Sequence, residues 1–362
     1  MTSGLGGSWL EEVDLRRGTR ESRQLRERDG EELVRRHRHL SAALVYDESS
    51  LIAIDEEIAT DVCGGEHFRP AIARVELDTL EVTELLPFEP LRKEDPHDCS
   101  SSVRLSGLGI DSDGQVLTFH RDSSASRTIS LIRIDPGARS WQTVSSGDEL
   151  CLPFNLTVDG DDSVVVACGS NETARVLRIH ADGRQQILAR ESLLFEPSHV
   201  ALPGDGTVLV SDRQHADPPD YYSTVGRVVR IEAGSGEQSI FLEGDPIGVP
   251  SVIVGDGVGG VVIGSAARAQ RDGYCPPVTL VRVDLEAGGH NELFRDETCY
   301  LPQIFSTIVL LPESESTTLG CVACALIALL ARRQCPAATA SLSHSDSTLP
   351  SSGRVLPSRV AR

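Results

Sequence analysis

The feature that most constrains the fold of this chain is a pattern repeated five times along it. Each copy consists of an alternating strand centred on an arginine, then a turn, then a second strand, and the arginines recur every 45 to 59 residues. A hairpin with an Asp/Gly-rich turn between apolar, β-branched runs precedes each copy, which strongly indicates antiparallel strands. Every repeat therefore supplies four strands. The arginines are Arg74, Arg133, Arg178, Arg230 and Arg282, and the preceding hairpins begin at Ala43, Gly107, Asn155, His199 and Val252.

Four strands per repeat at this spacing predict an all-β fold, a β-propeller of four-stranded blades. One small sheet cannot bury its faces alone, so each blade packs against its neighbours around an axis. A sandwich or a barrel would not give this period. The 32 glycines and the low aromatic content of 4% also favour short strands and tight turns. After five clear blades comes an extra strand, 302–311, which either closes the ring by pairing with the first blade or belongs to an incomplete six-bladed ring.

The connections between strands differ between the two ends of the predicted ring. The turns inside each hairpin are tight. The loops between the second and third strands of each blade, and the links between blades, are long and should share one face. Binding residues concentrate on such loops when a rigid scaffold holds them, so we expect the functional face there. The loop 215–222 combines acidic residues with tyrosines, which suit contact with a ligand or partner. The candidate ligand-binding residues of this loop are Asp217, Asp220, Tyr221 and Tyr222. The long loops of the whole face are 55–70, 120–128, 212–226 and 265–277.

Six cysteines fall in or beside these long connections. They flank the first, third and fifth blades in pairs, which predicts three disulfides. Because the cytosol keeps thiols reduced, disulfides would imply export. Unpaired loop thiols are the alternative and would suit a cytoplasmic scaffold. The pairs are Cys63 with Cys99, Cys151 with Cys168, and Cys275 with Cys299.

The net charge of −20 argues against a nucleic-acid partner, because binding to phosphates needs a basic patch. Acidity of this size serves solubility or the binding of cations and cationic ligands.

Each repeat contains a proline, an apolar strand, an Asp-Gly turn, a second strand and the motif Arg-Val/Ile-Asp. This pattern resembles the NHL-like and gluconolactonase-like six-bladed propellers over residues 42–310. The resemblance implies a divalent cation at the channel mouth, held by carboxylate and asparagine side chains. The matching positions here include Asn155, His199 and the strand-end Asp212, but also Val252 and Ile304, which cannot bind a metal. We therefore expect no catalytic residues and no cofactor. A reduced divalent-metal site is the alternative.

The two ends of the chain differ from the repeats. Residues 1–41 are polar and arginine-rich, and we expect a disordered extension there. They include no apolar leader, which favours a cytoplasmic protein as the alternative location. Residues 335–362 are expected to form a disordered, low-complexity tail.

The segment 312–334 contains an apolar block, 319–331, of 13 residues. As a helix it would extend about 20 Å, against about 30 Å of bilayer hydrocarbon. With Pro312-Glu313 before the block and Arg332-Arg333 after it, the segment resembles the PEP-CTERM sorting signals. That resemblance implies an exosortase-type processing partner and transient membrane contact through the block. A tail anchor and a plain hydrophobic tail remain alternatives.

The sequence thus predicts a propeller over 42–311 between these terminal segments. Our functional hypothesis is a non-enzymatic, exported or surface-associated propeller that binds a ligand or protein partner through its long-loop face. The alternative is a gluconolactonase-like or lyase-like enzyme with a reduced metal site.

Overall fold

The computed structural model describes most of the repeated region and parts of both ends. The described residues are 8–14, 19–24, 26–27, 38–47, 49–60, 66–88, 103–122, 128–151, 153–214, 225–244, 247–256, 259–266, 278–296, 308–311 and 325–331. Strands and the turns and links between them make up almost all of these ranges, and η2 (Asn171–Thr173) is a single turn of 3-10 helix. No helix in these ranges is long and apolar enough to cross a membrane.

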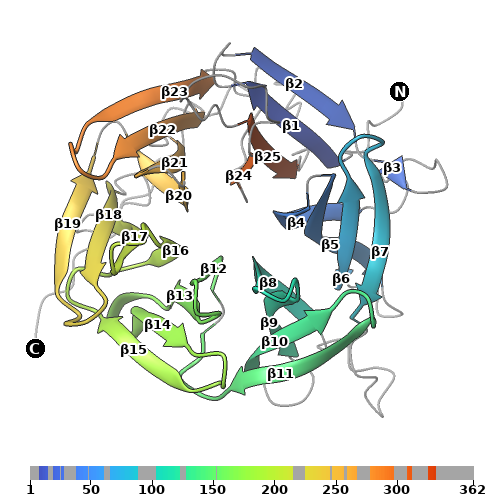
Figure 1. Ribbon diagram of the computed structural model, residues 1–362, viewed down its shortest axis with the longest axis horizontal. Helices are drawn as coiled ribbons and strands as arrows, with labels where there is room; N and C mark the ends of the chain where they lie inside the picture. Colours follow the sequence, from blue (N-terminus) through green and yellow to red (C-terminus); the bar gives the residue numbers. More distant parts are fainter. Residues whose placement is uncertain are drawn as a thin grey trace, which may run out of the picture.

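The strands form separate antiparallel sheets arranged around a central axis (Figure 1). Five of these sheets use consecutive strands and correspond to the five predicted blades, so the predicted all-β propeller is confirmed. Blade one contains β4 (Arg38–Asp47), β5 (Ser50–Thr60), β6 (Glu66–Glu76) and β7 (Glu81–Pro87), with β3 (Arg26–Glu27) parallel to β7. Blade two contains β8 (Val103–Ile110), β9 (Val116–Asp122), β10 (Ile129–Asp135) and β11 (Ser140–Ser146). Blade three contains β12 (Leu156–Val158), β13 (Val164–Cys168), β14 (Arg175–Ile179) and β15 (Gln185–Arg190).

The last two consecutive blades follow the same order. Blade four contains β16 (Pro197–Ala201), β17 (Thr207–Gln214), β18 (Val225–Glu232) and β19 (Gln238–Glu243). Blade five contains β20 (Val249–Gly255), β21 (Gly260–Ala266), β22 (Val278–Asp284) and β23 (His290–Asp296). In every blade the first strand lies nearest the axis and the fourth lies outermost (Figure 1).

A sixth sheet joins the two ends of the chain. It contains β1 (Ser8–Asp14), β2 (Thr19–Gln24), β24 (Ile308–Leu311) and β25 (Ala325–Ala331), in the order β2-β1-β25-β24. β1 pairs with β25 along seven residue pairs, from Ser8 opposite Ala331 to Asp14 opposite Ala325. The sheet lies between blade five and blade one in the ring (Figure 1). The extra strand therefore belongs to a sixth blade, which the N-terminal strands complete.

This sheet changes two expectations about the ends. Within the predicted disordered extension 1–41, the segments 8–14 and 19–24 are strands instead. Part of the predicted sorting segment, 325–331, is also a strand, with a neighbour on each side in the sheet.

The core lies in layers between neighbouring blades. Ile52, Ile54 and Ile72 of blade one pack with Ile132 and other residues of blade two. Similar aliphatic layers join the second blade to the third, the third to the fourth and the fourth to the fifth. Strands of four-stranded blades are short, so this packing on both faces supplies the burial that each sheet needs.

The recurring arginines have a structural role that the sequence did not specify. Each lies on the third strand of its blade and forms an ion pair with an aspartate in or next to the turn between the first two strands. Such a pair ties the third strand to the inner hairpin within one blade. The pairs are Arg74–Asp47 at 3.1 Å, Arg133–Asp111 at 3.0 Å, Arg178–Asp159 at 2.8 Å, Arg230–Asp205 at 3.0 Å and Arg282–Asp256 at 2.7 Å.

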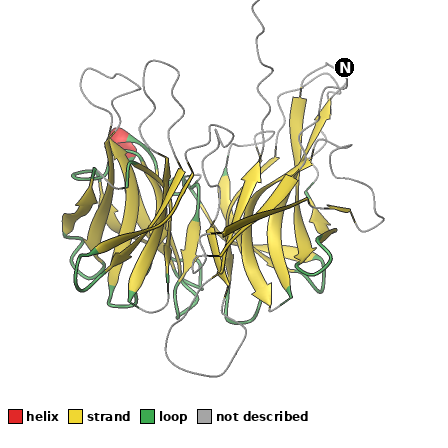
Figure 2. Cartoon of the chain, turned by 90° about the horizontal axis from the view of Figure 1, so that it is seen from above, coloured by secondary structure: helices red, strands yellow, loops and turns green. Residues whose placement is uncertain are grey.

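The tight turns lie along one face of the ring, as predicted (Figure 2). At the β8–β9 turn, for example, the Gly114 N–H donates to the Asp111 carbonyl at 3.0 Å. The predicted long loops are shorter than expected because the flanking strands extend into them; β5 reaches Thr60 and β6 starts at Glu66. The remaining parts of these loops, 61–65, 123–127, 215–224 and 267–277, lie outside the described residues.

Candidate functional site

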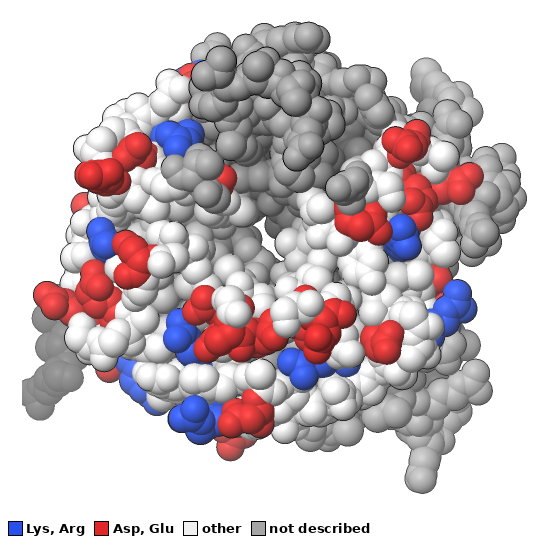
Figure 3. All heavy atoms as spheres, viewed as in Figure 1, with Lys and Arg blue, Asp and Glu red and all other residues white. Residues whose placement is uncertain are grey.

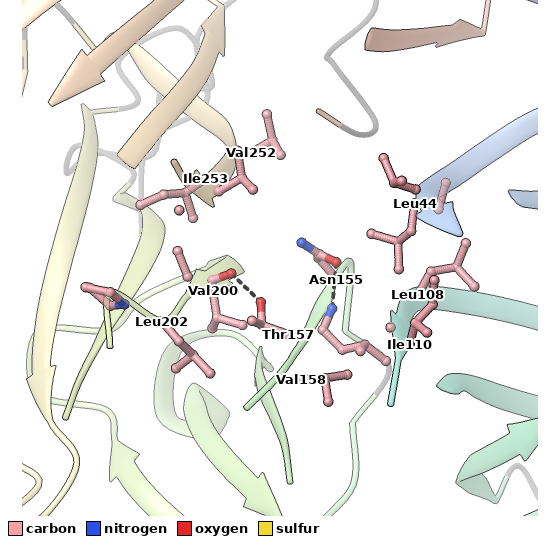
Figure 4. A pocket seen from close by; sticks show the side chains of 18 of the residues that line it. Leu44, Leu108, Ile110, Asn155, Thr157, Val158, Val200, Leu202, Val252 and Ile253 are labelled. Atoms are coloured by element: carbon pink, nitrogen blue, oxygen red, sulfur yellow. Dashed lines mark hydrogen bonds between the residues drawn. The ribbon is translucent and has the colours of Figure 1, made fainter. Parts of the chain in front are cut away.

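A cavity of about 580 Å³ lies at the centre of the ring, where the innermost strands of five blades converge. Its walls are backbone and aliphatic side chains (Figure 4). This size falls within the range of small-molecule sites in proteins. The lining includes Leu44, Leu108, Ile110, Val158, Val200, Leu202, Val252 and Ile253.

The cavity is displaced toward the tight-turn face. In β8 the lining residues are 108–110, next to the turn, and in β16 and β20 they are likewise the last residues and the start of the turn. We expected the functional face at the long loops. The cavity lies toward the opposite end of the ring. The sequence did contain a signal for the central cavity, because small and β-branched residues mark the innermost strands that line it.

Close approach of blades two and three shapes one wall. A Cβ on Gly109 would lie only 2.5 Å from Leu156 Cδ1 and from Val158 Cγ2. Real side-chain carbons do not lie that close, so any larger residue at 109 would displace the Leu156 and Val158 side chains. With the glycine in place, the two strands line the same cavity.

Two polar side chains lie in this mainly apolar lining, Asn155 and Thr157. The Thr157 hydroxyl donates to the Val200 carbonyl at 2.8 Å, which ties blade three to blade four. The Asn155 Oδ1 accepts the Leu156 N–H at 2.7 Å. The amide nitrogen of Asn155 points into the open space (Figure 4). It is thus placed to donate a hydrogen bond to a bound molecule.

Asp212, predicted as a possible metal ligand, is fully buried in blade four and does not line the cavity. Its Oδ2 is 2.8 Å from the Nε of Arg227, a side chain that is 7% exposed. Its Oδ1 accepts the backbone N–H groups of Phe195 at 2.9 Å and Glu196 at 2.8 Å. Burial raises the pKa of Asp212, while Arg227 and the two N–H groups act in the opposite direction. Both carboxylate oxygens are occupied by protein groups, which indicates a structural role.

His199 is also buried, but on the other side of the same sheet. It pairs with Ser211 across β16 and β17, and residues opposite each other in a ladder point to the same side. Asp212 is the next residue along β17, so its side chain points to the opposite side. Burial, and secondarily Arg213, lowers the pKa of His199 to about 3, so its imidazole is neutral. Its Nδ1 is buried with no hydrogen-bond partner among the described residues.

The three residues proposed for a reduced metal site are therefore not brought together. Asn155 lines the cavity, whereas His199 and Asp212 are buried on opposite faces of blade four. Val252, at a matching position of the family pattern, adds an aliphatic side chain to the cavity. Within the described ranges, no group of three His, Cys, Asp or Glu residues is placed to hold a metal ion. The donors present do not fit a divalent cation at this cavity.

One of the three predicted disulfides is confirmed. Cys151, in the link into blade three, is bonded to Cys168 at the end of β13, with 5.8 Å between their Cα atoms. The bond holds the entry of the blade against its second strand.

The other predicted residues lie outside the described parts of the chain. They are Cys63, Cys99, Cys275 and Cys299, the loop residues Asp217, Asp220, Tyr221 and Tyr222, the possible blade-opening Ile304, and the sorting-signal residues Pro312, Glu313, Arg332 and Arg333.

Comparisons with known proteins add little to this geometry. No family model matches the sequence, and no curated protein matches it either. Among solved structures, a gluconolactonase from Xanthomonas campestris has a TM-score of 0.48 and 14% identity, covering 82% of this chain and 86% of that one. An oligogalacturonate lyase in complex with manganese has a TM-score of 0.47 and 12% identity, covering 82% and 90%. A putative glucose dehydrogenase from Thermus thermophilus has a TM-score of 0.46 and 10% identity, covering 80% and 95%. Likenesses of this level carry no statement about activity.

Proposed function

We propose that this protein is a non-catalytic β-propeller that binds an apolar small molecule, or an apolar group of a partner, in its central cavity. The observation that carries the proposal is the lining itself, in which five inner strands supply aliphatic side chains and backbone around one inward-pointing amide, Asn155. Apolar walls with a few placed polar groups are typical of ligand sites. Burial of apolar ligand surface would supply the affinity, and the Asn155 amide would orient the ligand.

The long-loop face, which we predicted as the binding face, remains a second part of this proposal. Its candidate residues in 215–222 lie outside the described ranges. A ligand in the ring and a partner on that face are compatible, since the lining residues of the cavity lie toward the other end.

The test uses N-phenyl-1-naphthylamine, a neutral apolar probe whose fluorescence rises in an apolar site. We expect saturable binding by the wild-type chain and its loss in Asn155→Trp, because the indole would fill the space into which the amide points. The matched control is Asn291→Trp, which adds the same indole to an exposed position on the outer strand β23. Absence of binding to the wild type, or equal binding by both variants, would overturn the proposal.

The alternative is a lactonase-like or lyase-like enzyme with a reduced metal site. The separation of His199 from Asp212 and the occupation of the Asp212 carboxylate count against it. Metal that copurifies with the protein and is lost in Asp212→Asn, the milder substitution, while the far-UV circular dichroism spectrum is retained, together with lactone hydrolysis, would favour the enzyme.

Export from the cytoplasm is a further part of the proposal, and the Cys151–Cys168 disulfide supports it. A sorting signal that is cleaved at the end of the propeller fits less well, because its removal would take β25 from the sixth sheet. We therefore base the proposed location on the disulfide. Mass spectrometry of unreduced tryptic peptides from protein purified from its native cells tests it, and a reduced Cys151–Cys168 pair there would contradict export.

A further inference from the structure

The face onto which the cavity is displaced is strongly acidic. Acidic side chains are spread around the central opening on the face shown in Figure 3, and basic ones are fewer. Three of the turn aspartates directly follow a residue that lines the cavity: Asp111 follows Ile110, Asp159 follows Val158 and Asp256 follows Gly255. The acidic groups thus surround an apolar cavity.

The aspartates that pair with the recurring arginines are neutralised locally, so they contribute little net field. Further carboxylates of the same turns add to them, among them Asp113 on the β8–β9 turn and Asp161 and Asp162 on the β12–β13 turn. Ser112 brings these two turns together, because its N–H donates to Asp162 Oδ1 at 2.8 Å and its hydroxyl donates to Oδ2 at 2.6 Å. The carboxylates of two blades are thereby held beside the same stretch of the rim.

The Asp161 and Asp162 carboxylates are ionised at neutral pH. Hydrogen bonds from Ser163 lower the pKa of Asp161, and hydrogen bonds from Ser112 lower the pKa of Asp162. The outer turns of this face contain Asp135, Asp182 and Asp284, but the first two turns also contain Arg139 and Arg184, so the excess negative charge lies on the inner turns. An aliphatic interior under an anionic rim complements a molecule that has an apolar body and a positive end.

We propose that the central cavity binds amphiphilic cations, with an aliphatic group inside the ring and an ammonium or similar head group at the acidic rim. This rests on the proposed function, because it specifies the ligand class of the same cavity. Anions of the same shape would be repelled by the rim. Neutral molecules would bind through the apolar contacts alone.

The experiment compares three probes with the same six-carbon alkyl chain, hexyltrimethylammonium, 1-hexanol and heptanoate, by displacement of N-phenyl-1-naphthylamine at low ionic strength. We expect the cation to bind about tenfold more tightly than the anion, because the exposed carboxylates attract the cation and repel the anion. The ratio should shrink as salt is added, because screening reduces the contribution of exposed charges.

Two pairs of substitutions assign the preference to the rim. Asp113→Asn with Asp161→Asn should reduce the cation-to-anion ratio several-fold and leave the affinity for hexanol unchanged. The matched control, Asp148→Asn with Glu172→Gln, removes two exposed carboxylates beside the connections of the opposite face and should leave the ratio unchanged.

The outcomes separate the two proposals. Displacement by hexanol without any charge preference, or a preference that persists in Asp113→Asn/Asp161→Asn, would overturn the cation proposal and keep the apolar cavity. If none of the three probes displaces the dye, both proposals fail.

Discussion

Removal of the Asp212 carboxylate should destabilise the fold strongly. Its side chain is fully buried and its partner Arg227 is 7% exposed, so Asp212→Ala leaves a buried guanidinium without its counter-charge. The change also removes the acceptor for the N–H groups of Phe195 and Glu196. Breaking a buried pair on one side costs about 3–5 kcal/mol. We expect a loss of that size in the free energy of unfolding.

The assay is urea denaturation followed by far-UV circular dichroism, in which the midpoint falls at an unchanged slope. Asp212→Asn keeps an oxygen for the two N–H groups but loses the charge, so its loss should be smaller, about 1.5–3 kcal/mol.

The matched control lies in the same blade. Asp205 also pairs with an arginine of β18, Arg230, at 3.0 Å, but its side chain is 49% exposed. Exposed pairs contribute about 0–1 kcal/mol, and the lost acceptor of the Thr207 hydroxyl adds about 1 kcal/mol, so Asp205→Ala should cost clearly less than Asp212→Ala. Equal effects of the two substitutions, or a loss below about 1 kcal/mol for Asp212→Ala, would refute the structural role that we assign to Asp212, because the cited cost of a broken buried pair would be absent.

Three further predictions concern other parts of the fold. The pKa of His199 is lowered from 6.5 to about 3 in the folded protein, so on acidification this histidine takes up a proton first in the unfolded chain. The free energy of unfolding should therefore fall from pH 6.5 toward pH 3, by up to about 1.4 kcal/mol per pH unit. His199→Gln should show a shallower pH dependence in the same denaturation assay, and an identical slope would contradict the assignment. Reduction, or Cys151→Ser, opens a loop with a sequence separation of 17 and should cost about 3 kcal/mol; an unchanged thermal midpoint on reduction would argue against it. Truncation after residue 324 removes β25 and its seven residue pairs with β1, whereas truncation after 334 keeps them. At about 1 kcal/mol per hydrogen bond, only the shorter chain should unfold more readily and become sensitive to proteolysis at 8–24; equal resistance would contradict the sixth sheet.

The propeller could be predicted because its signals are local. Alternating apolar residues, Asp-Gly turns and an arginine at a fixed place in each repeat are properties of short segments, and their period counts the blades. The Cys151–Cys168 pair followed from its position around one blade. The tight turns, such as that at Asp111, were predicted for the same reason.

The candidate site was predicted only in part. Asn155 was singled out and does line the cavity, but the sequence could not tell that its neighbours there would be Val158 and Val252 rather than metal ligands. The side to which His199 and Asp212 point depends on the register of β16 against β17. Register is a property of the assembled sheet, and a shift by one residue reverses the face.

The sequence by itself determined the four-stranded repeat, the recurrent arginines and the acidic, tight-turned hairpins, because each depends on residues close together in the chain. Only the tertiary structure decided which aspartate each arginine binds, that Asp212 is held by Arg227, and that the cavity lies toward the tight-turn face. It also decided that β1 and β25, more than 300 residues apart, share one sheet. Partners so distant in sequence leave no local pattern, since only closure of the whole ring brings them together.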